Sequence, residues 1–280
     1  MMMKKNLYSL VLLLAFCIIG SSVYGQESVA LKYNFKEGKT FRMTMSMNTT
    51  IVQSMMGQEM KIIADGVSKS EIKFTNVDPG GNASALMSIL SISTKTSAMG
   101  QEKVENKSDF KKDGISMVFS QSGKVSTKIT DTTLSSIESI SNMKFFLLPV
   151  REIKIGEKWV DRQIDTMHMQ PSNPITSMIT TSENEYTLAG KEIKDGRELY
   201  KISTTGTLEI AGKGKQSGMD LFMEGTGQAS GFFYFDPSIS MVVYSESDGE
   251  INTTITVTGQ QNMTIPMSQK IKTVTTLEEV

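Results

Sequence analysis

The residues whose chemistry stands out in this chain are its methionines, which number 21 among 280 residues. Residues 167–169 read Met-His-Met, with His168 at the centre, and Met43, Met45 and Met47 alternate with polar residues in another segment. Thioether and imidazole groups together suit Cu(I), which prefers soft ligands. Methionine also fills or lines adaptable apolar interiors, such as a pocket for a lipid. We favour the apolar interior and keep a copper-binding protein using Met and His168 as an alternative.

Most other catalytic and metal-binding chemistries lack the residues that they need. His168 is the single histidine and Cys17 the single cysteine, so a multi-histidine metal site and a Ser-His-Asp triad with its usual elbow are not supported. The glycines at 212, 214, 225 and 227 lack the spacing of a nucleotide-binding loop and indicate bends in strands instead. We therefore expect no cofactor and no enzyme activity, although a hydrolase using two of the 30 acidic residues stays open.

The first 25 residues have the pattern of a secretory signal peptide. Lys4 and Lys5 form a basic start, an apolar run follows over residues 7–20, and small residues precede a cleavage site after Gly25. The pattern predicts an exported protein of the periplasm or cell surface. An uncleaved membrane anchor and lipidation at Cys17 are the alternatives.

The net charge of the chain limits the classes of molecule that we expect it to bind. The formal net charge of the chain is −1, and no dense basic cluster is present. Nucleic acids and anionic membranes attract basic surfaces, so neither is expected as a partner. The remaining candidates are an apolar small molecule or lipid and a protein partner in the cell envelope.

The elements that would position these residues are β-strands. Apolar residues, with threonine in the last two segments, recur at every second position in many segments, including residues 29–35, 41–47, 115–119, 219–223, 251–257 and 271–277. This period is typical of strands with one buried face, and turn residues such as those at 78–82 and 194–196 separate the runs. We expect a mainly β protein built from curved antiparallel sheets.

One segment has a different period. Apolar residues recur at every third position from 131 to 146, with Asp131 as an N-cap and Pro149 beyond the end, which predicts an amphipathic helix over residues 131–148. This helix would connect two similar halves, residues 26–130 and 149–280. Each half begins with a strand, a glycine turn at Gly38 or Gly156, and an aromatic residue that opens a long strand. Repetition of ordinary strand-and-turn patterns is the alternative to a true internal repeat.

These motifs support a resemblance. The signal ending at Gly25, the opening Leu31-x-Tyr33-x-Phe35-x-x-Gly38-x-x-Phe41 and the later Ile155-Gly156-Glu157-x-Trp159 resemble those of uncharacterised secreted β-rich proteins of the Bacteroidota. The resemblance implies a periplasmic or surface location. The expected architecture is also remotely similar to the periplasmic lipoprotein-carrier fold, a likeness of architecture alone.

Together these observations favour a non-enzymatic periplasmic or cell-surface protein that binds an apolar, lipid-like ligand. The predicted ligand-binding residues are Met43, Met45, Met47 and Trp159, although a structural role for Trp159 in the core is also weighed. The second hypothesis is a structural or interaction module of the cell envelope without a small ligand.

Overall fold

A computed structural model describes residues 28–55, 57–108, 110, 115–129, 145–168, 175–216, 218–259 and 262–280. Every regular element among them is a strand, which confirms the mainly β prediction. The strands are β1 (Ser28–Leu31), β2 (Thr40–Met55), β3 (Gln58–Val77), β4 (Ala83–Ala98), β5 (Gln101–Lys107), β6 (Ile115–Phe119), β7 (Val125–Ile129), β8 (Arg151–Lys154), β9 (Lys158–His168), β10 (Ile175–Lys194), β11 (Arg197–Gln216), β12 (Met219–Asp236), β13 (Met241–Thr258) and β14 (Met263–Glu279).

Two predictions fall wholly or mostly outside the described residues. The signal peptide lies within residues 1–27, and the connecting helix falls on residues 130–144 for most of its length. The described remainder of the predicted helix, residues 145–148, forms no regular structure. Its side chains instead enter the core, where Leu147 and Leu148 are buried.

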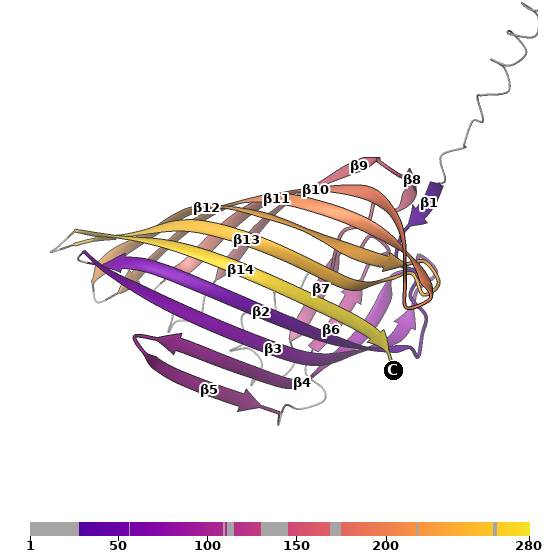
Figure 1. Ribbon diagram of the computed structural model, residues 1–280, viewed down its shortest axis with the longest axis horizontal. Coiled ribbons are helices and arrows are strands. Elements are labelled where there is room, and N and C mark those ends of the chain that lie inside the picture. Colours follow the sequence, from indigo (N-terminus) through magenta and orange to yellow (C-terminus); the bar gives the residue numbers. More distant parts are fainter. Residues whose placement is uncertain are drawn as a thin grey trace, which may run out of the picture.

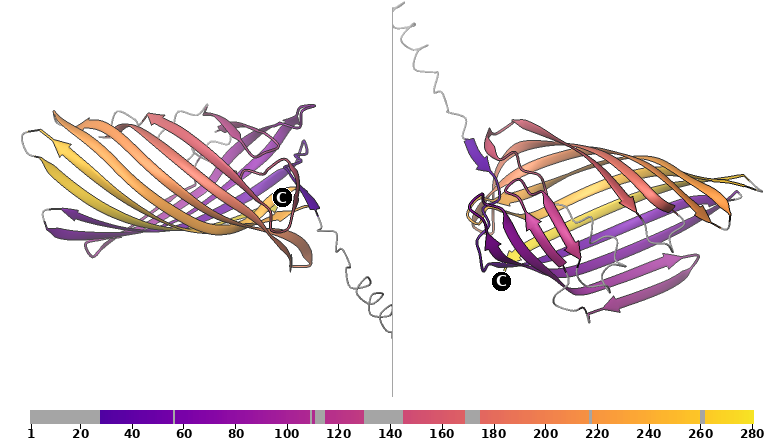
Figure 2. Two further views of the ribbon diagram at one scale, coloured as in Figure 1. Left: turned by 90° about the horizontal axis from the view of Figure 1, so that it is seen from above. Right: turned by 180° about the vertical axis from the view of Figure 1, so that it is seen from behind.

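Twelve of the strands form one antiparallel sheet in the order β7-β6-β4-β3-β2-β14-β13-β12-β11-β10-β9, with β5 also pairing with β4. The sheet is strongly twisted and rolled, so that its two ends β7 and β9 lie toward the same side (Figures 1 and 2). We expected separate curved sheets in the two halves. Twelve described strands from both halves instead share one sheet, because β2 of the first half pairs with β14 along 13 residues from Phe41 to Gln53.

The long strands give the sheet an inner and an outer face. On the inner face, Phe41, Met43 and Thr49 of β2 are buried, whereas the alternating positions from Arg42 to Thr50 carry polar side chains that face outward. This follows from the two-residue period of a strand, which sends successive side chains to opposite faces. The predicted alternation therefore identifies the inner face correctly.

The two ends of the rolled sheet differ. The small antiparallel sheet of β1 and β8 lies at one end, near the C-terminus, and we call this the capped end (Figure 1). The hairpin tips between β2 and β3, β11 and β12, and β13 and β14 lie at the opposite end, which we call the open end. Leu31 and Ile153 of the small sheet are fully buried, so the cap contributes to the core.

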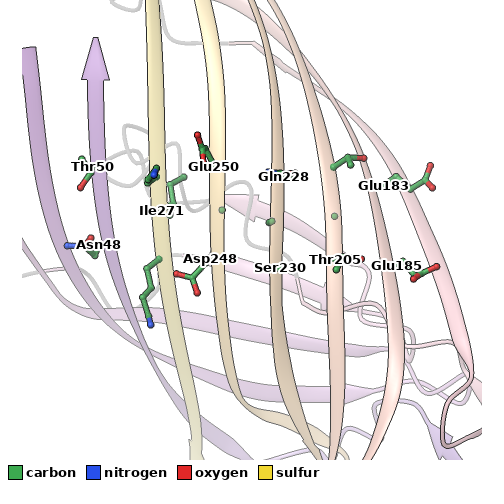
Figure 3. A pocket seen from close by; sticks show the side chains of 16 residues that line it. Asn48, Thr50, Glu183, Glu185, Thr205, Gln228, Ser230, Asp248, Glu250 and Ile271 are labelled. Atoms are coloured by element: carbon green, nitrogen blue, oxygen red, sulfur yellow. The ribbon is translucent and has the colours of Figure 1, made fainter. Parts of the chain in front are cut away.

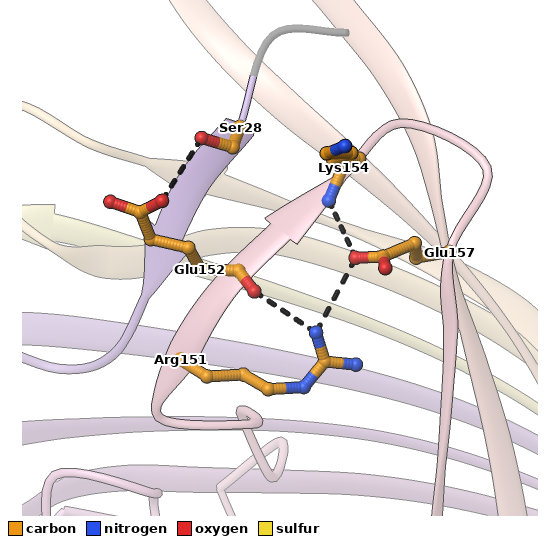
Figure 4. Close-up of polar contacts among 5 residues, drawn as sticks. All are labelled: Ser28, Arg151, Glu152, Lys154 and Glu157. Carbon is orange, nitrogen blue, oxygen red and sulfur yellow. Dashed lines mark hydrogen bonds and ion pairs between the residues drawn. The ribbon is translucent and has the colours of Figure 1, made fainter.

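Polar contacts hold the cap at its surface (Figure 4). Ser28 Oγ donates to Glu152, and Arg151 donates to the Glu152 carbonyl at 2.9 Å and to Glu157 at 3.4 Å. The backbone N–H of Lys154 also donates to Glu157, at 2.8 Å. This backbone hydrogen bond, together with Arg151, lowers the pKa of Glu157. The contacts fix the turn that leads from β8 into β9.

The predicted turns are present at the capped end. Asp195 and Gly196 both have positive φ, of 50° and 74°, as a two-residue hairpin turn requires. In the turn after β3, the Asp78 carboxylate accepts hydrogen bonds from the backbone and side chain of Asn82. These turns set the register of the long hairpins that form the inner face.

Candidate ligand-binding site

The inner face carries two apolar clusters, one at each end of the rolled sheet. The larger one, at the capped end, is rich in aromatic rings. Phe74 is almost fully buried, and its ring centroid lies 4.8 Å from that of Phe35, 5.9 Å from that of Phe41 and 5.7 Å from that of Phe119. Rings in such tilted and edge-on contacts pack densely. This end of the interior is therefore densely packed, and the cavity beside these rings has a volume of only about 130 Å³.

The smaller cluster lies at the open end. Its buried members are Ile175, Leu221 and Val257, and its partly buried members include three methionines and one isoleucine: Met219, Met223, Met263 and Ile255. These residues belong to β10, β12, β13 and β14 and share the inner face by register. The methionine side chain is flexible and adapts to its neighbours, so the side chains at this end can rearrange more easily than the rings at the capped end.

A hollow lies between the two clusters. It consists of two adjoining cavities of about 260 and 240 Å³. They share five small or polar lining residues: Ser182, Asn184, Gly206, Ala229 and Ser247. Phe146 and Tyr186 line it on the side of the capped end, and Leu208, Ile251 and Ile271 line it further along the strands. The hollow is thus bounded by apolar groups, with small polar groups between them.

Glycines leave this part of the inner face without bulky side chains. A Cβ added to Gly206 would lie 2.3 Å from Oδ1 of Asn184, and one added to Gly231 would lie 2.2 Å from the backbone oxygen of Glu246. Real Cβ atoms do not approach other atoms so closely, because such contacts are strongly repulsive. At Gly231 the neighbouring strand approaches so closely that a larger residue would be prevented, whereas at Gly206 the Asn184 side chain would have to move.

Aromatic side chains form the wall between the core and the hollow. Phe146 stacks on Phe233 with ring centroids 4.3 Å apart, and Trp159 stacks on Tyr186 at 5.2 Å. Trp159 Nε1 donates a hydrogen bond to the carbonyl of Leu147 at 2.9 Å. Burial, with a smaller contribution from Asp161, raises the pKa of Tyr186 to about 12, so its hydroxyl is neutral at physiological pH.

The four predicted ligand-binding residues all lie on the inner face. Met43 is buried in the core, Met45 is half-buried, and Met47 is 42% exposed. Met47 pairs directly with Thr273, which lines the hollow, and Trp159 contacts Tyr186, which lines it as well. None of the four is among the described lining residues of the hollow. Met47 and Trp159 each lie next to one of those lining residues, while Met43 lies deeper in the capped end.

Sequence reasoning missed the small polar residues of the hollow, such as Ser182, Asn184 and Ser247. Their signal was weak, since the neighbours on the same face of each strand are themselves small or polar, apart from Tyr186. Only the strand pairing shows that Asn184 lies opposite Gly206 and Ser247 opposite Gly231.

A second hollow lies on the outer face (Figure 3). It is open, has a volume of about 1050 Å³, and carries acidic side chains from β10 and β13 beside lysines from β14. Glu183 pairs with Arg162 at 2.6 Å, and Glu185 pairs with Lys158 at 2.7 Å. Exposed ion pairs of this kind are typical of a hydrated surface. We therefore consider the inner hollow the better candidate site.

The structure offers little for metal or redox chemistry in the residues that it describes. No group of three or more His, Cys, Asp or Glu side chains that could hold a metal ion occurs among them. β9 ends at His168, and Met169 lies outside the described residues. Within the same described ranges, no helix has the length and hydropathy required to span a bilayer.

No protein-family model matches the chain, and no curated protein matches its sequence. Among solved structures, lipovitellin, studied for its lipid–protein interactions, is similar with a TM-score of 0.43 and 11% identity, covering 87% of this chain and 26% of the lipovitellin chain. OccK7 and OccK5 of Pseudomonas aeruginosa align with TM-scores of 0.27 and 0.24 and identities of 6% and 7%. Each covers 88% of this chain, and 100% and 99% of the respective matched chain. The chain is thus remotely similar in structure to lipovitellin and to these two P. aeruginosa proteins.

Proposed function

We propose that this protein binds an apolar, lipid-like ligand inside the rolled sheet, as a non-enzymatic protein of the periplasm or cell surface. The observation that carries the proposal is the inner hollow between the aromatic wall and the methionine-containing open end. Its two adjoining cavities together approach the size of small-molecule pockets, which are roughly 300–1,000 Å³. An alkyl chain lying along the strands would contact Phe146 and Tyr186 first and Leu208 and Ile251 further on.

We include Met45, Met47 and Trp159 among the ligand contacts, with Met43 supporting them from the core. Met47 exposes a large apolar side chain on the inner face beside Thr273 of the hollow. The flexible thioether chain of methionine suits a ligand of variable shape. Trp159 would act through its stack on Tyr186.

The test is binding of the neutral fluorescent probe N-phenyl-1-naphthylamine to the mature protein. We expect saturable binding that becomes at least about tenfold weaker in Ala229→Phe, since the new ring would occupy the hollow and a tenfold loss corresponds to about 1.4 kcal/mol. Thr205→Phe is the matched control, because Thr205 is exposed on the outer face of the neighbouring strand β11. Equal loss of binding in both variants, or no binding to the wild type, would contradict the proposal.

We propose further that the chain is exported after cleavage at Gly25, and that its two halves share one arrangement of strands and turns. The second proposal is supported by a shared backbone pattern: Gly38 donates to the carbonyl of Phe74, and Gly156 donates to that of Leu188. In both places a β-bulge follows, at Phe74/Asn76 and Leu188/Gly190. N-terminal sequencing of mature protein tests the cleavage site.

A second candidate function is an interaction module of the cell envelope that contacts a protein partner. Its support is a group of exposed apolar side chains on the outer face of β9 and β10: Val160, Ile164 and Ile179, of which Ile164 is 73% exposed. Large exposed apolar side chains gathered on one surface favour a protein contact. Loss of an envelope partner in Ile164→Lys, with probe binding unchanged, would favour this function.

Copper binding by Met167, His168 and Met169 is the third candidate. A titration with Cu(I) under reducing conditions tests it, with His168→Ala as the variant. Binding at micromolar or tighter affinity that is lost in this variant would place copper ahead of the lipid-like ligand.

A further inference from the structure

The charges of the inner face are distributed unequally. Register and alternation place no lysine, arginine or glutamate on the inner face of β2 or β3 in the residues that the structure describes. On the same face of the described parts of β10–β14 they place such residues only toward the capped end: Lys191, Glu198 and Glu279. The cations near the hollow are on the outer face, where Lys158, Arg162 and Lys272 pair with glutamates. By register, β5 carries Lys103, Glu105 and Lys107 on this face, away from the lining of the hollow, and Lys103 forms an ion pair with Glu105. The described lining of the hollow contains no basic side chain.

The charge that the inner face does carry beside the hollow is negative. Asp161 of β9 pairs across the sheet with Asn184, a lining residue, and lies between Trp159 and Gln163 on the same face. Its carboxylate accepts a hydrogen bond from Nε2 of Gln163 at 2.6 Å. Gln163 also lines the hollow. An amide and a carboxylate therefore meet at one edge of the hollow.

The remaining polar groups of the hollow are hydroxyls and amides. Ser182, Thr204 and Ser247 supply hydroxyls that can donate or accept, and Asn184 supplies both an acceptor and donors. A hydroxyl or an ammonium group of a ligand would find acceptors here. An anionic group would lose its water, meet no cation and lie close to the carboxylate of Asp161, which disfavours its entry.

We propose that the inner hollow selects amphipathic ligands whose polar head is uncharged or cationic and rejects those whose head is an anion. This inference rests on the proposed ligand-binding function and names its ligand class: an alkyl chain carrying an alcohol or amine head rather than a carboxylate or phosphate. Asp161 sets the selectivity, and the small residues around Asn184 leave the space for the head.

The experiment is displacement of N-phenyl-1-naphthylamine at neutral pH by ligands of equal chain length below their micellar concentrations: 1-dodecanol, dodecylamine and dodecanoate. We expect the alcohol and the amine to displace the probe at concentrations at least about tenfold lower than dodecanoate, a difference of about 1.4 kcal/mol in binding. In Asp161→Asn the disadvantage of dodecanoate should shrink several-fold, because the isosteric amide removes the negative charge.

Glu185→Gln is the matched control. It removes one negative charge from the outer face of the neighbouring strand β10, so the order of the three ligands should not change. If the probe binds but dodecanoate displaces it as well as the alcohol does, or if both variants change the order equally, the selectivity is wrong while ligand binding stands. Absence of probe binding to the wild type would instead contradict the proposed function itself.

Discussion

The capped end and the open end of the inner face are built from the same long strands and pack in different ways. At the capped end, rings such as Phe74, Phe119 and Phe233 are fully buried and fixed by one another and by the cap. At the open end, Leu221 and Val257 are buried, but the surrounding methionines are only partly so. We infer that the capped end provides most of the stability and that the open end is free to adapt.

The reason for the difference is the cap. Residues 145–153 and the segment after β1 lie against the capped end, where Tyr33 donates to the Phe146 carbonyl and Leu148 donates to that of Ser122. Gly123 makes this fit possible, because an added Cβ would lie 2.6 Å from the Phe146 carbonyl oxygen. Its φ of +90° also favours glycine. Within the described ranges, the open end has only hairpin tips.

The largest expected effect is the loss of a ring from the capped end. Phe74→Ala should lower the free energy of unfolding by about 3–5 kcal/mol, because it removes a buried ring and leaves a cavity. Met223→Ala should cost less than half as much, since its side chain is partly exposed. Chemical denaturation measures both, with Phe222→Ala, an exposed ring on the outer face of β12, as the control. Equal costs at the two ends would remove the distinction between them.

A smaller effect is expected between the two ends, where glycines allow close approach of the strands. Gly231→Ala should destabilise the protein by about 1–3 kcal/mol through overpacking, since the new Cβ would lie 2.2 Å from the Glu246 carbonyl oxygen. Gly249→Ala on the neighbouring strand would make only ordinary contacts, the nearest at 3.5 Å, and should be tolerated. Thermal unfolding of the two variants measures the difference in their stability. A neutral Gly231→Ala would show that the strands can separate here.

Tyr186, in the wall between the core and the hollow, should make stability depend on alkaline pH. Its folded-state pKa of about 12 lies above the ordinary 10.0, so its contribution is constant below pH 10 and is lost as the pH rises through 10 toward 12. At pH 11 this loss is about 1.4 kcal/mol. Tyr186→Phe should remove this part of the alkaline decline, as followed by denaturation at pH 8 and pH 11. An unchanged decline in the variant would mean that Tyr186 is accessible to water.

The smallest expected effect on stability is at the two partly or largely exposed methionines of β2, Met45 and Met47. Met45→Leu should cost less than about 1.5 kcal/mol, because the volume is nearly conserved. Met47→Leu should cost less still, since Met47 is more exposed. Denaturation gives the stability, and probe titration of the same variants shows whether the thioethers matter for binding. A large loss of stability in Met47→Leu would indicate that this part of the inner face is as tightly packed as the core.

The sequence predicted the strands well because their period is local. Segments such as 115–119, 219–223 and 271–277 lie in strands, and the burial of alternate residues follows the pattern. It predicted the shared face of Met43, Met45 and Met47 for the same reason. It did not predict that the two halves share one sheet, because the pairing of β2 with β14 joins residues at opposite ends of the chain.

Residue types and spacing alone thus determined a mainly β protein, its turns, and strands with one buried face. The tertiary structure decided where that face is filled and where it is hollow. Asn184, Gly206, Ala229 and Ser247 lie on four different strands and form one site only because the register aligns them. The physical reason is that hydrophobic alternation fixes the direction of a side chain, whereas packing density depends on which strands become neighbours.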